Sequence, residues 1–322
     1  MEAIEVKNLV KKFKNTSAVD DISFSVKEGE CFGLLGPNGA GKTTTINILS
    51  TLLKSTAGFA RVAGFDVNKY RNEVRQNLGI VFQEPALDSK LTGKENLEFH
   101  AMMYGIEPAA RNKRISYLLD LVELSEKANT LVQNYSGGMK RRLEIARGLI
   151  QKPKVLFLDE PTLGLDSQTR RLIWDYIKKL NKENDVTIIL TTHYMEEADY
   201  LCDRIAIIDH GKIIAMDTPQ SLKAGLGGEV ISIVVGSNIQ ELKTALGKIN
   251  WIKSIKEHDG CNECLSLTVE KANIRIPEII DISSNVGAKI ISIDVHIPSL
   301  DDVFLKFTGT TIRNVEEREK IW

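Results

Sequence analysis

Short β-branched apolar runs alternate with helix-period segments over the first two thirds of the chain. The runs predict strands, and an apolar period of about 3.6 residues predicts helices. The predicted strands are Glu2–Val10, Ala18–Val26, Glu30–Leu35, Ile80–Gln83, Val155–Asp159, Thr187–Thr191 and Arg204–Asp209. The predicted helices are Lys42–Leu53, Asn96–Tyr104, Arg111–Leu121 and Met139–Ile150. This alternation indicates an α/β fold with a largely parallel sheet, an antiparallel part at its start, and a helical subdomain inserted at about residues 84–150.

The pattern changes near Thr218–Gly228, where one proline and three glycines interrupt the chain. The elements predicted beyond this point are strand Val230–Val235, helix Ile239–Ile249, strand Trp251–Glu257, a turn around Asp259-Gly260, strand Leu265–Val269, helix Ile274–Val286 and strand Lys289–His296. This βαββαβ order is that of a small α+β, ferredoxin-like domain. We therefore expect a first domain over residues 1–222, an accessory domain over 229–309 that includes the amphipathic segment Leu300–Phe307, and a charged tail over 310–322.

Charge and hydropathy narrow the classes of function. The 322 residues carry 42 Lys+Arg and 43 Asp+Glu, a net charge of −1, which argues against bulk nucleic-acid binding. Apolar runs stop far short of the roughly 18 residues of a membrane span. Met1–Lys14 lacks the apolar core of a secretory signal. We expect a cytoplasmic chain that reaches a membrane only through a partner.

Four cysteines are too few and too unevenly spaced for a disulfide framework, so free thiols are expected. They are Cys31, Cys202, Cys261 and Cys264. The last two form a lone CxxC, which a hairpin with two thiols near its turn explains more simply than a metal site. A metal site would need His258 and His296 to approach them.

The strongest chemical motif fits the pattern G-x-x-x-x-G-K-[ST] between a predicted strand and a predicted helix. Its residues are Gly36, Pro37, Asn38, Gly39, Ala40, Gly41, Lys42, Thr43 and Thr44. Glycines let consecutive backbone N–H groups surround phosphate oxygens, and the helix N-terminus adds its positive dipole end. Lys42 would reach the β/γ-phosphates, and Thr43 would place its hydroxyl on Mg²⁺.

A second motif is an apolar strand that ends in two carboxylates, Asp159 and Glu160. Together with the phosphate loop, Asp159 becomes a direct or indirect Mg²⁺ partner. Glu160 becomes the group that polarises the attacking water. Adjacent strand-end side chains point in different directions, so one can face the metal and the other the water.

A third motif, Tyr135–Met139, contains Ser136-Gly137-Gly138 just before a predicted helix. Ser136 has the character of an N-cap, and the glycines allow a close approach to an anion at the helix end. The two phosphate-type helix ends need not serve the same nucleotide in one subunit. A head-to-tail pair of chains would close one ATP between them.

In this order, these motifs resemble those of the ATPase subunits of ABC transporters. The set comprises Gly36–Thr44, Gln83, Ser136–Met139, Asp159-Glu160, Leu165-Asp166 and His193, and the resemblance covers about residues 2–222. It implies a P-loop NTPase cassette that couples hydrolysis of ATP, with Mg²⁺, to transport. In the family Gln83 would meet Mg²⁺ or water and sense the membrane partner, Asp166 would contact the opposite subunit, and His193 would contact the γ-phosphate.

Three features depart from or qualify the family pattern. The signature has Tyr135 and Met139 where Leu and Gln are commonest, but it keeps its Ser-Gly-Gly. The adenine-stacking aromatic residue would be Phe13, which lacks the hydroxyl of the usual Tyr and is equally explained as a core residue. The region between Gln83 and the signature has no long heptad array, so it does not resemble chromosome-maintenance or repair ATPases.

Two further segments resemble the daunorubicin-resistance-type export branch. They are Pro298–Gly309 and Gly164–Trp174. The resemblance assigns residues 229–309 to that branch's accessory domain, in which no catalytic group is visible. A dimer-stabilising or regulatory role explains this domain better than a ligand sensor, because it shows no cluster of convergent polar residues.

The sequence therefore predicts a homodimeric ATPase subunit, peripheral on the inner face of the cell membrane. It would power export of a hydrophobic small molecule or lipid through separately encoded integral-membrane permease subunits, with no nucleic acid as partner. One alternative is a soluble ABC ATPase acting on ribosomes or DNA. Another is a catalytically idle regulatory module, which the intact Lys42, Asp159, Glu160 and His193 disfavour.

Overall fold

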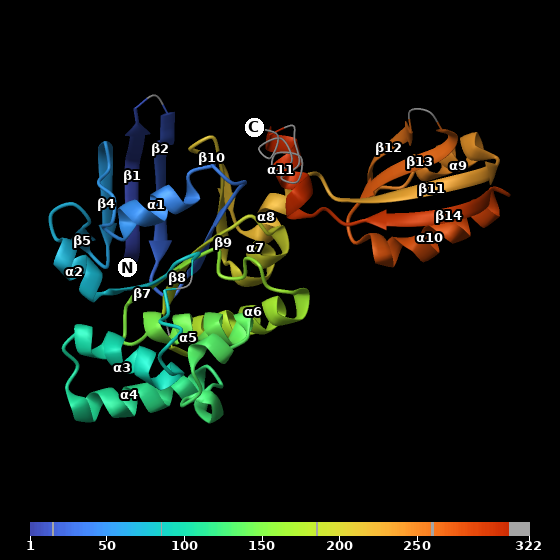
Figure 1. Cartoon of the computed structure of the whole chain (residues 1–322). Helices are drawn as coiled ribbons and strands as arrows, with labels where there is room; N and C mark the ends of the chain where they lie inside the picture. The colour runs from blue at the N-terminus through green and yellow to red at the C-terminus, as the bar shows by residue number, and fades with distance from the viewer. Residues whose placement is uncertain (15, 85, 185, 259–260, 309–322) are drawn as a thin grey trace. The chain divides into compact units, whose positions relative to one another are not determined.

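The computed structural model describes residues 1–14, 16–84, 86–184, 186–258 and 261–308. The chain divides into two compact units, which adjoin in the sequence at Pro219 and Gln220, and the second unit ends at Lys306 (Figure 1). The predicted charged tail and the turn at Asp259-Gly260 lie outside the described residues.

A six-stranded sheet forms the centre of the first unit, in the order β10-β9-β3-β8-β7-β6. Its strands are β3 (Cys31–Leu35), β6 (Leu78–Val81), β7 (Val155–Asp159), β8 (Thr187–Thr192), β9 (Arg204–Asp209) and β10 (Lys212–Asp217). All neighbours run parallel except β10 and β9. Strands β3, β7 and β8 are buried along their whole length, which explains their continuous apolar character.

An antiparallel sheet of order β2-β1-β4-β5 confirms the antiparallel part predicted at the start of the chain. Its strands are β1 (Glu2–Phe13), β2 (Thr16–Lys27), β4 (Ala57–Val62) and β5 (Phe65–Asp66). The sequence pattern missed β4, β5 and β10. Strand β4 contains Gly58 at φ +82°, where a Cβ would lie 2.1 Å from the carbonyl oxygen of Asn8, so a glycine is needed in mid-strand.

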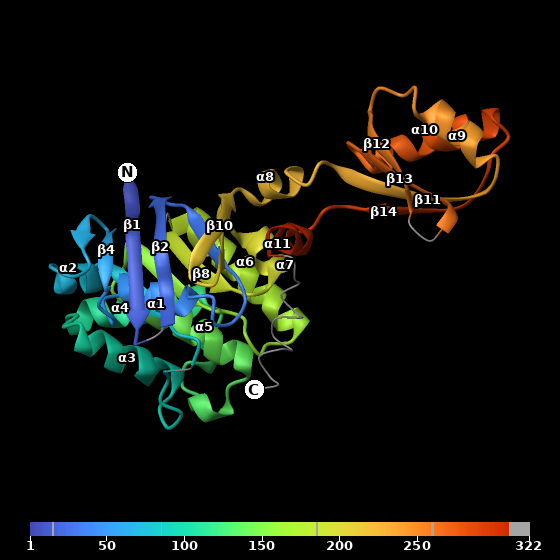
Figure 2. The ribbon, with the colours of Figure 1, turned by 90° about the horizontal axis from the view of Figure 1, so that it is seen from above.

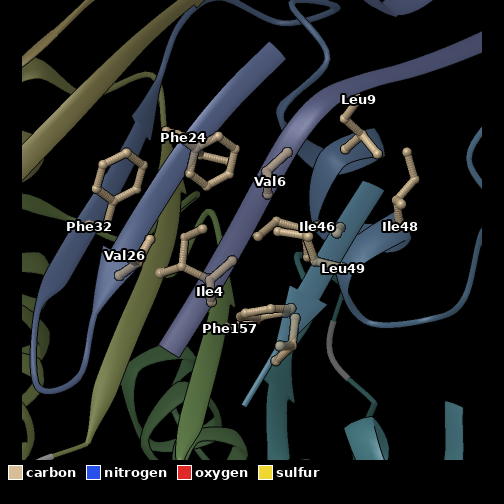
Figure 3. Packing of buried hydrophobic residues seen from close by; sticks show 14 of the residues in the cluster. Ile4, Val6, Leu9, Phe24, Val26, Phe32, Ile46, Ile48, Leu49 and Phe157 are labelled. Carbon is tan, nitrogen blue, oxygen red and sulfur yellow. The ribbon is translucent and has the colours of Figure 1, made fainter. Parts of the chain in front are cut away.

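The hydrophobic core of the first unit lies where the antiparallel sheet meets helix α1 and the large sheet (Figure 3). Phe24 of β2 stacks on Phe32 of β3 with ring centroids 5.3 Å apart. Helix α1 contributes fully buried residues such as Ile46, and β7 contributes Phe157. This packing fixes the ends of β3 and β7 and the start of α1 relative to one another.

Seven α-helices of the first unit lie within the described residues. They are α1 (Lys42–Leu49), α2 (Arg71–Gln76), α3 (Gly93–Met103), α4 (Pro108–Leu121), α5 (Gly137–Gly148), α6 (Ser167–Asn184) and α7 (Met195–Leu201). Helix α8 (Pro219–Ala224) begins at the last residue before the boundary and otherwise belongs to the second unit. Helices α3, α4 and α5 pack on one another, and α5 also packs on β6 and α6 (Figure 1). Helix α1 ends a turn earlier than predicted, because the chain turns at Thr51 with φ +67°.

The second unit contains a four-stranded antiparallel sheet of order β12-β13-β11-β14. In chain order its elements are β11 (Glu229–Ser237), α9 (Ile239–Leu246), β12 (Ile252–His258), β13 (Cys261–Val269), α10 (Ala272–Asn285) and β14 (Lys289–His296). Both helices pack on one face of the sheet (Figure 2), over a core that includes Leu242, Leu267 and Ile279. The predicted βαββαβ order is confirmed, and helix α11 (Leu300–Thr308) follows it.

Candidate active site

The glycine-rich loop Gly36–Thr44 joins β3 to helix α1, as the motif predicts. A Cβ at Gly36 would lie 2.1 Å from the carbonyl oxygen of Ile208, so no side chain fits there. Gly41 has φ +104°, and its Cβ would lie 2.2 Å from the carbonyl oxygen of Ala18. The glycines therefore let the backbone pass close to β9 and β2 before it enters the N-terminus of α1.

Lys42 folds back over this loop with 4% of its surface exposed. Its Nζ donates to the carbonyl oxygens of Gly36 at 2.8 Å and Pro37 at 2.9 Å. The same Nζ lies 3.4 Å from Oε1 of Glu160. A buried cation thus stands at the centre of a loop whose shape suits an anion.

Asp159 ends strand β7 and faces the first turn of α1. Its Oδ1 accepts hydrogen bonds from Oγ1 of Thr43 at 3.2 Å and Oγ1 of Thr191 at 2.5 Å. Burial raises the pKa of Asp159, although both hydroxyls oppose that rise. A buried carboxyl group beside the hydroxyl of Thr43 supplies oxygen ligands of the kind that a divalent cation such as Mg²⁺ prefers.

Glu160 adopts the left-handed region with φ +46°, which is unusual for a residue other than glycine. Its backbone N–H donates to the carbonyl oxygen of Thr191 at 3.1 Å and to the hydroxyl of Thr191 at 3.0 Å. Its Oε2 lies 3.2 Å from Nδ1 of His193. Burial alone would raise the pKa of Glu160, but His193 and Lys42 outweigh it and lower that pKa, so the carboxylate is ionised at neutral pH.

The structure thus brings five of the predicted residues into one connected cluster: Lys42, Thr43, Asp159, Glu160 and His193. The contacts that connect these five residues do not involve the remaining predicted polar side chains. These remaining side chains are those of Asn38, Thr44, Gln83, Ser136 and Asp166. Gln83 is exposed just beyond β6.

Two of these outlying residues serve as helix caps. Ser136 is the N-cap of α5, and its hydroxyl accepts from the N–H of Met139 at 3.2 Å, as its N-cap character predicted. Asp166 stands directly before α6, and its carboxylate accepts from the N–H and the hydroxyl of Thr169 at 2.9 Å and 2.7 Å. Both side chains are on the surface, where a second molecule can reach them.

The signature glycines lie close to the segment that follows Glu160. A Cβ at Gly138 would lie 2.5 Å from the side chain of Thr169, and one at Gly137 would lie 3.3 Å from Leu165. A side chain at position 138 would therefore displace Thr169, whereas one at position 137 would meet only a tight contact with Leu165.

Phe13 ends β1 with 46% of its surface exposed, and Nζ of Lys11 lies 4.8 Å from its ring centroid. The alternative that Phe13 is a core residue is wrong. Its exposed ring is free to stack on a planar ligand.

Sequence reasoning missed three buried residues around the cluster: Arg141, Thr191 and Glu197. Glu197 has no exposed surface, and its Oε1 accepts from Oγ1 of Thr162 at 2.7 Å and Nε1 of Trp174 at 2.8 Å. Burial raises its pKa, although hydrogen bonds from neighbouring side chains oppose the rise. Its only sequence signal is its place on α7, three residues beyond Tyr194, which does not distinguish it from the exposed Glu196.

The predicted CxxC lies in the second unit, on β13. Among the described residues, no group of three His, Cys, Asp or Glu side chains is placed to hold a metal ion. The side chain of Cys261 lies outside the described residues. Cys31 and Cys202 are buried free thiols, whereas Cys264 is disulfide-bonded, so the expectation of free thiols is wrong at Cys264.

Comparison with known proteins identifies the family of the chain. The family model described as "ABC transporter" matches residues 19–163, and "ATP-binding protein DrrA1-3-like, C-terminal domain" matches residues 218–308. The phosphate loop, the strand-end carboxylates and the signature helix thus belong to an ABC-type ATPase. The chain is a member of the ATP-binding proteins of ABC transporters, in the group that carries the DrrA-like C-terminal domain.

Two relatives and one solved structure show how far the similarity extends. The linearmycin resistance ATP-binding protein LnrL of Bacillus subtilis is 39% identical over 97% of this chain and 100% of its own. The daunorubicin resistance ATP-binding protein DrrA2 of Streptomyces coeruleorubidus is 38% identical over 98% of each chain. A dimeric ATP-binding cassette, MJ0796 in a post-hydrolysis state with ADP and Pi, aligns with a TM-score of 0.61 and 31% identity, covering 67% of this chain and 98% of that one.

Proposed function

We propose that this chain is the ATP-hydrolysing subunit of an exporter for a hydrophobic small molecule or lipid. It would act on the inner face of the cell membrane through separately encoded permease subunits. The observation that carries the proposal is the connected cluster from Lys42 to His193, in which an ionised Glu160 stands between two cationic or proton-donating partners. The relatives named for linearmycin and daunorubicin resistance support the class of substrate.

In this proposal the phosphate loop binds the triphosphate and Phe13 stacks on the adenine. Lys42 exchanges its contact with Glu160 for the β/γ-phosphate oxygens, because phosphate offers it a stronger charge-assisted hydrogen bond. Glu160, no longer paired with Lys42, is then free to orient and polarise the attacking water. His193, 3.2 Å from Glu160, would contact the γ-phosphate.

Thr43 and Asp159, together with Gln83 beyond β6, would hold Mg²⁺. When bound, Mg²⁺ would neutralise phosphate charge and polarise the phosphoryl group. Its positive charge would also offset the burial that raises the pKa of Asp159, so that this carboxyl would ionise. Thr191 would keep the carboxylate aimed through its hydroxyl.

A second copy of the chain would complete the site. The exposed Ser136 and Gly137 present a helix N-terminus at the surface, and its N–H groups and positive dipole end suit a phosphate. A head-to-tail homodimer would place this end against the nucleotide of the partner, and Asp166 would lie at the same interface. The dimeric cassette with ADP and Pi supports this arrangement.

The permease would dock on the helical layer of the first unit. The end of α3 exposes Phe99 by 60%, Met102 by 56% and Met103 by 70%, a concentration of apolar surface that is typical of an interaction site. Beside it lies a cavity of about 530 Å³ whose lining reaches Phe82, the residue before Gln83. A helix or loop of the permease seated there would press on the segment that leads to Gln83. Within the described residues, no helix has the length and apolarity needed to cross a membrane.

Replacing Glu160 by glutamine tests the hydrolysis and dimer parts together. The E160Q chain should bind Mg²⁺ and ATP, turn over at least about 10²-fold more slowly, and elute as a stable dimer in light-scattering gel filtration. E196Q, which alters the exposed acid on α7, is the matched control and should behave like the wild type. A monomeric E160Q chain at saturating ATP would contradict the dimer.

Co-purification from detergent-solubilised native membranes tests the transporter part. A multi-span protein should co-elute with the wild-type chain, and replacing Phe99 and Met103 by glutamate should remove it without changing ATP hydrolysis by the free chain. Ribosomal proteins or DNA in place of a multi-span protein would contradict the proposal.

A further inference from the structure

A buried arginine on helix α5 contacts both the end of β7 and the segment that follows β6. Arg141 lies on α5, five residues after the signature Ser136, and is only 6% exposed. A buried guanidinium is costly unless every donor is satisfied. Arg141 makes five contacts that use all three of its nitrogens.

Three of these contacts hold the chain at the end of β7. Nε donates to the carbonyl oxygen of Pro161 at 2.6 Å, and Nη2 donates to those of Asp159 at 3.1 Å and Glu160 at 3.2 Å. The N–H of Glu160 is already held by Thr191 on β8. The left-handed Glu160 is therefore fixed on both sides of its Cα, by a strand at its nitrogen and by Arg141 at its carbonyl.

The other two contacts hold the segment around Gln83. Nη1 of Arg141 donates to the carbonyl oxygen of Phe82 at 2.6 Å and to Oε2 of Glu144 at 3.0 Å. Glu144, one turn further along α5 and 1% exposed, accepts from the N–H of Ala86 at 2.9 Å through its other oxygen. Arg147, a turn beyond, donates to the carbonyl oxygen of Ala86. Side chains on one face of α5 are thus hydrogen-bonded to the backbone on both sides of Gln83.

We infer that Arg141, supported by Glu144, is a positioning residue for hydrolysis: it sets the backbone of Glu160 in register with the segment that flanks Gln83. A displacement of Phe82 or Ala86 shifts the guanidinium, and the guanidinium shifts the carbonyl of Glu160. Because Glu160 has a strained backbone conformation, small backbone shifts change the direction in which its carboxylate points. The inference rests on the hydrolysis part of the proposed function and needs no permease.

Arg141→Lys in the full chain tests this role. Lysine keeps the charge but supplies one ammonium in place of a planar fork, so it cannot serve Phe82 and Pro161 together. We expect kcat for ATP to fall on the order of 10- to 100-fold, with KM changed by less than about three-fold, because the loss is one of geometry and not of nucleotide contact. Arg142→Lys is the matched control, since Arg142 is the next residue on α5 and pairs with the exposed Glu123.

Glu144→Gln provides a second, milder variant. It keeps an acceptor for the N–H of Ala86 but removes the charge that faces Arg141, and we expect a several-fold loss of kcat. Amide hydrogen exchange then separates positioning from general destabilisation. In R141K, exchange should rise together at the segment flanking Gln83 and at the end of β7, and in R142K at neither.

Three results would overturn the inference. One is an R141K chain with kcat within about two-fold of the R142K chain. Another is a loss of activity that a smaller fraction of nucleotide-binding protein fully explains. The third is faster exchange at one segment without the other. A wild-type chain that hydrolyses no ATP would instead contradict the proposed function itself.

Discussion

The two units of the chain bury different chemistry. In the first unit Lys42 is 4% exposed, Arg141 6% and Glu197 not at all. Among the described residues of the second unit, Ser283 is the one buried polar side chain, and the core is otherwise made of residues such as Leu267 and Ile279. The first unit therefore carries a cost of desolvation that the second avoids.

That difference agrees with a proposed site in the first unit. Buried charges are costly unless they are paired and hydrogen-bonded, and replacing them by apolar groups often stabilises a protein. The first unit keeps Lys42, Asp159 and Glu160 buried and close together, which is the arrangement that the proposed hydrolysis requires. The second unit gains its stability from apolar packing of a split-βαβ fold, and its described residues have no comparable cluster. We expect it to support assembly and not chemistry.

Removing a buried charge from the first unit should have the largest effect on ATP hydrolysis at Lys42, replaced by alanine. Lys42→Ala removes the cation that fills the phosphate loop and also leaves Glu160 with one partner fewer. ATP hydrolysis should fall on the order of 10²–10³-fold in a steady-state phosphate-release assay. Lys212→Ala, at an exposed lysine of β10, is the control and should hydrolyse ATP normally. A K42A chain with more than a tenth of the wild-type rate would argue that the cluster is not the site.

The contrast also explains how much the sequence predicted. The phosphate loop, the strand-end carboxylates and the signature are local motifs in which a few residues fix one backbone geometry. Lys42, Asp159 and Ser136 could therefore be predicted as site residues from their neighbours alone. The parallel strands were predicted because both of their faces are buried, which makes them continuously apolar. The βαββαβ order of the second unit was predictable because its strands and helices have clear apolar periodicities.

The supporting residues were not predictable, because their roles depend on contacts between distant segments. Arg141 stands among polar residues of α5 and reaches carbonyls about 20 and 60 residues away in the sequence. Glu197 is buried while its identical neighbour Glu196 is exposed, which only the packing of α7 decides. Strand β4 contains a glycine, and half of its residues are exposed, so it has too little apolar alternation to be recognised.

A matched pair of core substitutions gives the next largest effect. Leu158 on β7 and Leu267 on β13 are both fully buried in central strands, so truncation to alanine should cost each unit about 2–5 kcal/mol of stability. Only Leu158→Ala should also slow ATP hydrolysis, because Leu158 directly precedes Asp159. Denaturant unfolding followed by hydrogen exchange locates each loss, and a phosphate-release assay below the transition measures kcat.

Two results would contradict this functional difference between the two units. If L267A reduced kcat as strongly as L158A while the first unit kept its exchange protection, the second unit would contribute to the chemistry. If neither variant changed kcat, the geometry at the end of β7 would be less demanding than the network around Glu160 implies.

The smallest expected effect concerns His100, a partly buried polar residue of α3 in the first unit. Burial first, and the nearby Arg147 second, lower its pKa from 6.5 to about 4. Between pH 6.5 and pH 4 the unfolded chain therefore binds a proton at His100 that the folded chain does not bind. The free energy of unfolding is unaffected by this proton above pH 6.5 and decreases as the pH falls toward 4. Because the ring is partly exposed, we expect a decrease of only about 1 kcal/mol. The free energy of unfolding, measured in denaturant at pH 7.5 and pH 5, should fall less in His100→Gln than in the wild type, whereas the exposed His210→Gln should fall as the wild type does. Equal pH dependence of H100Q and wild type would show that α3 tolerates the charged ring, and that this buried polar position carries none of the cost that sets the first unit apart.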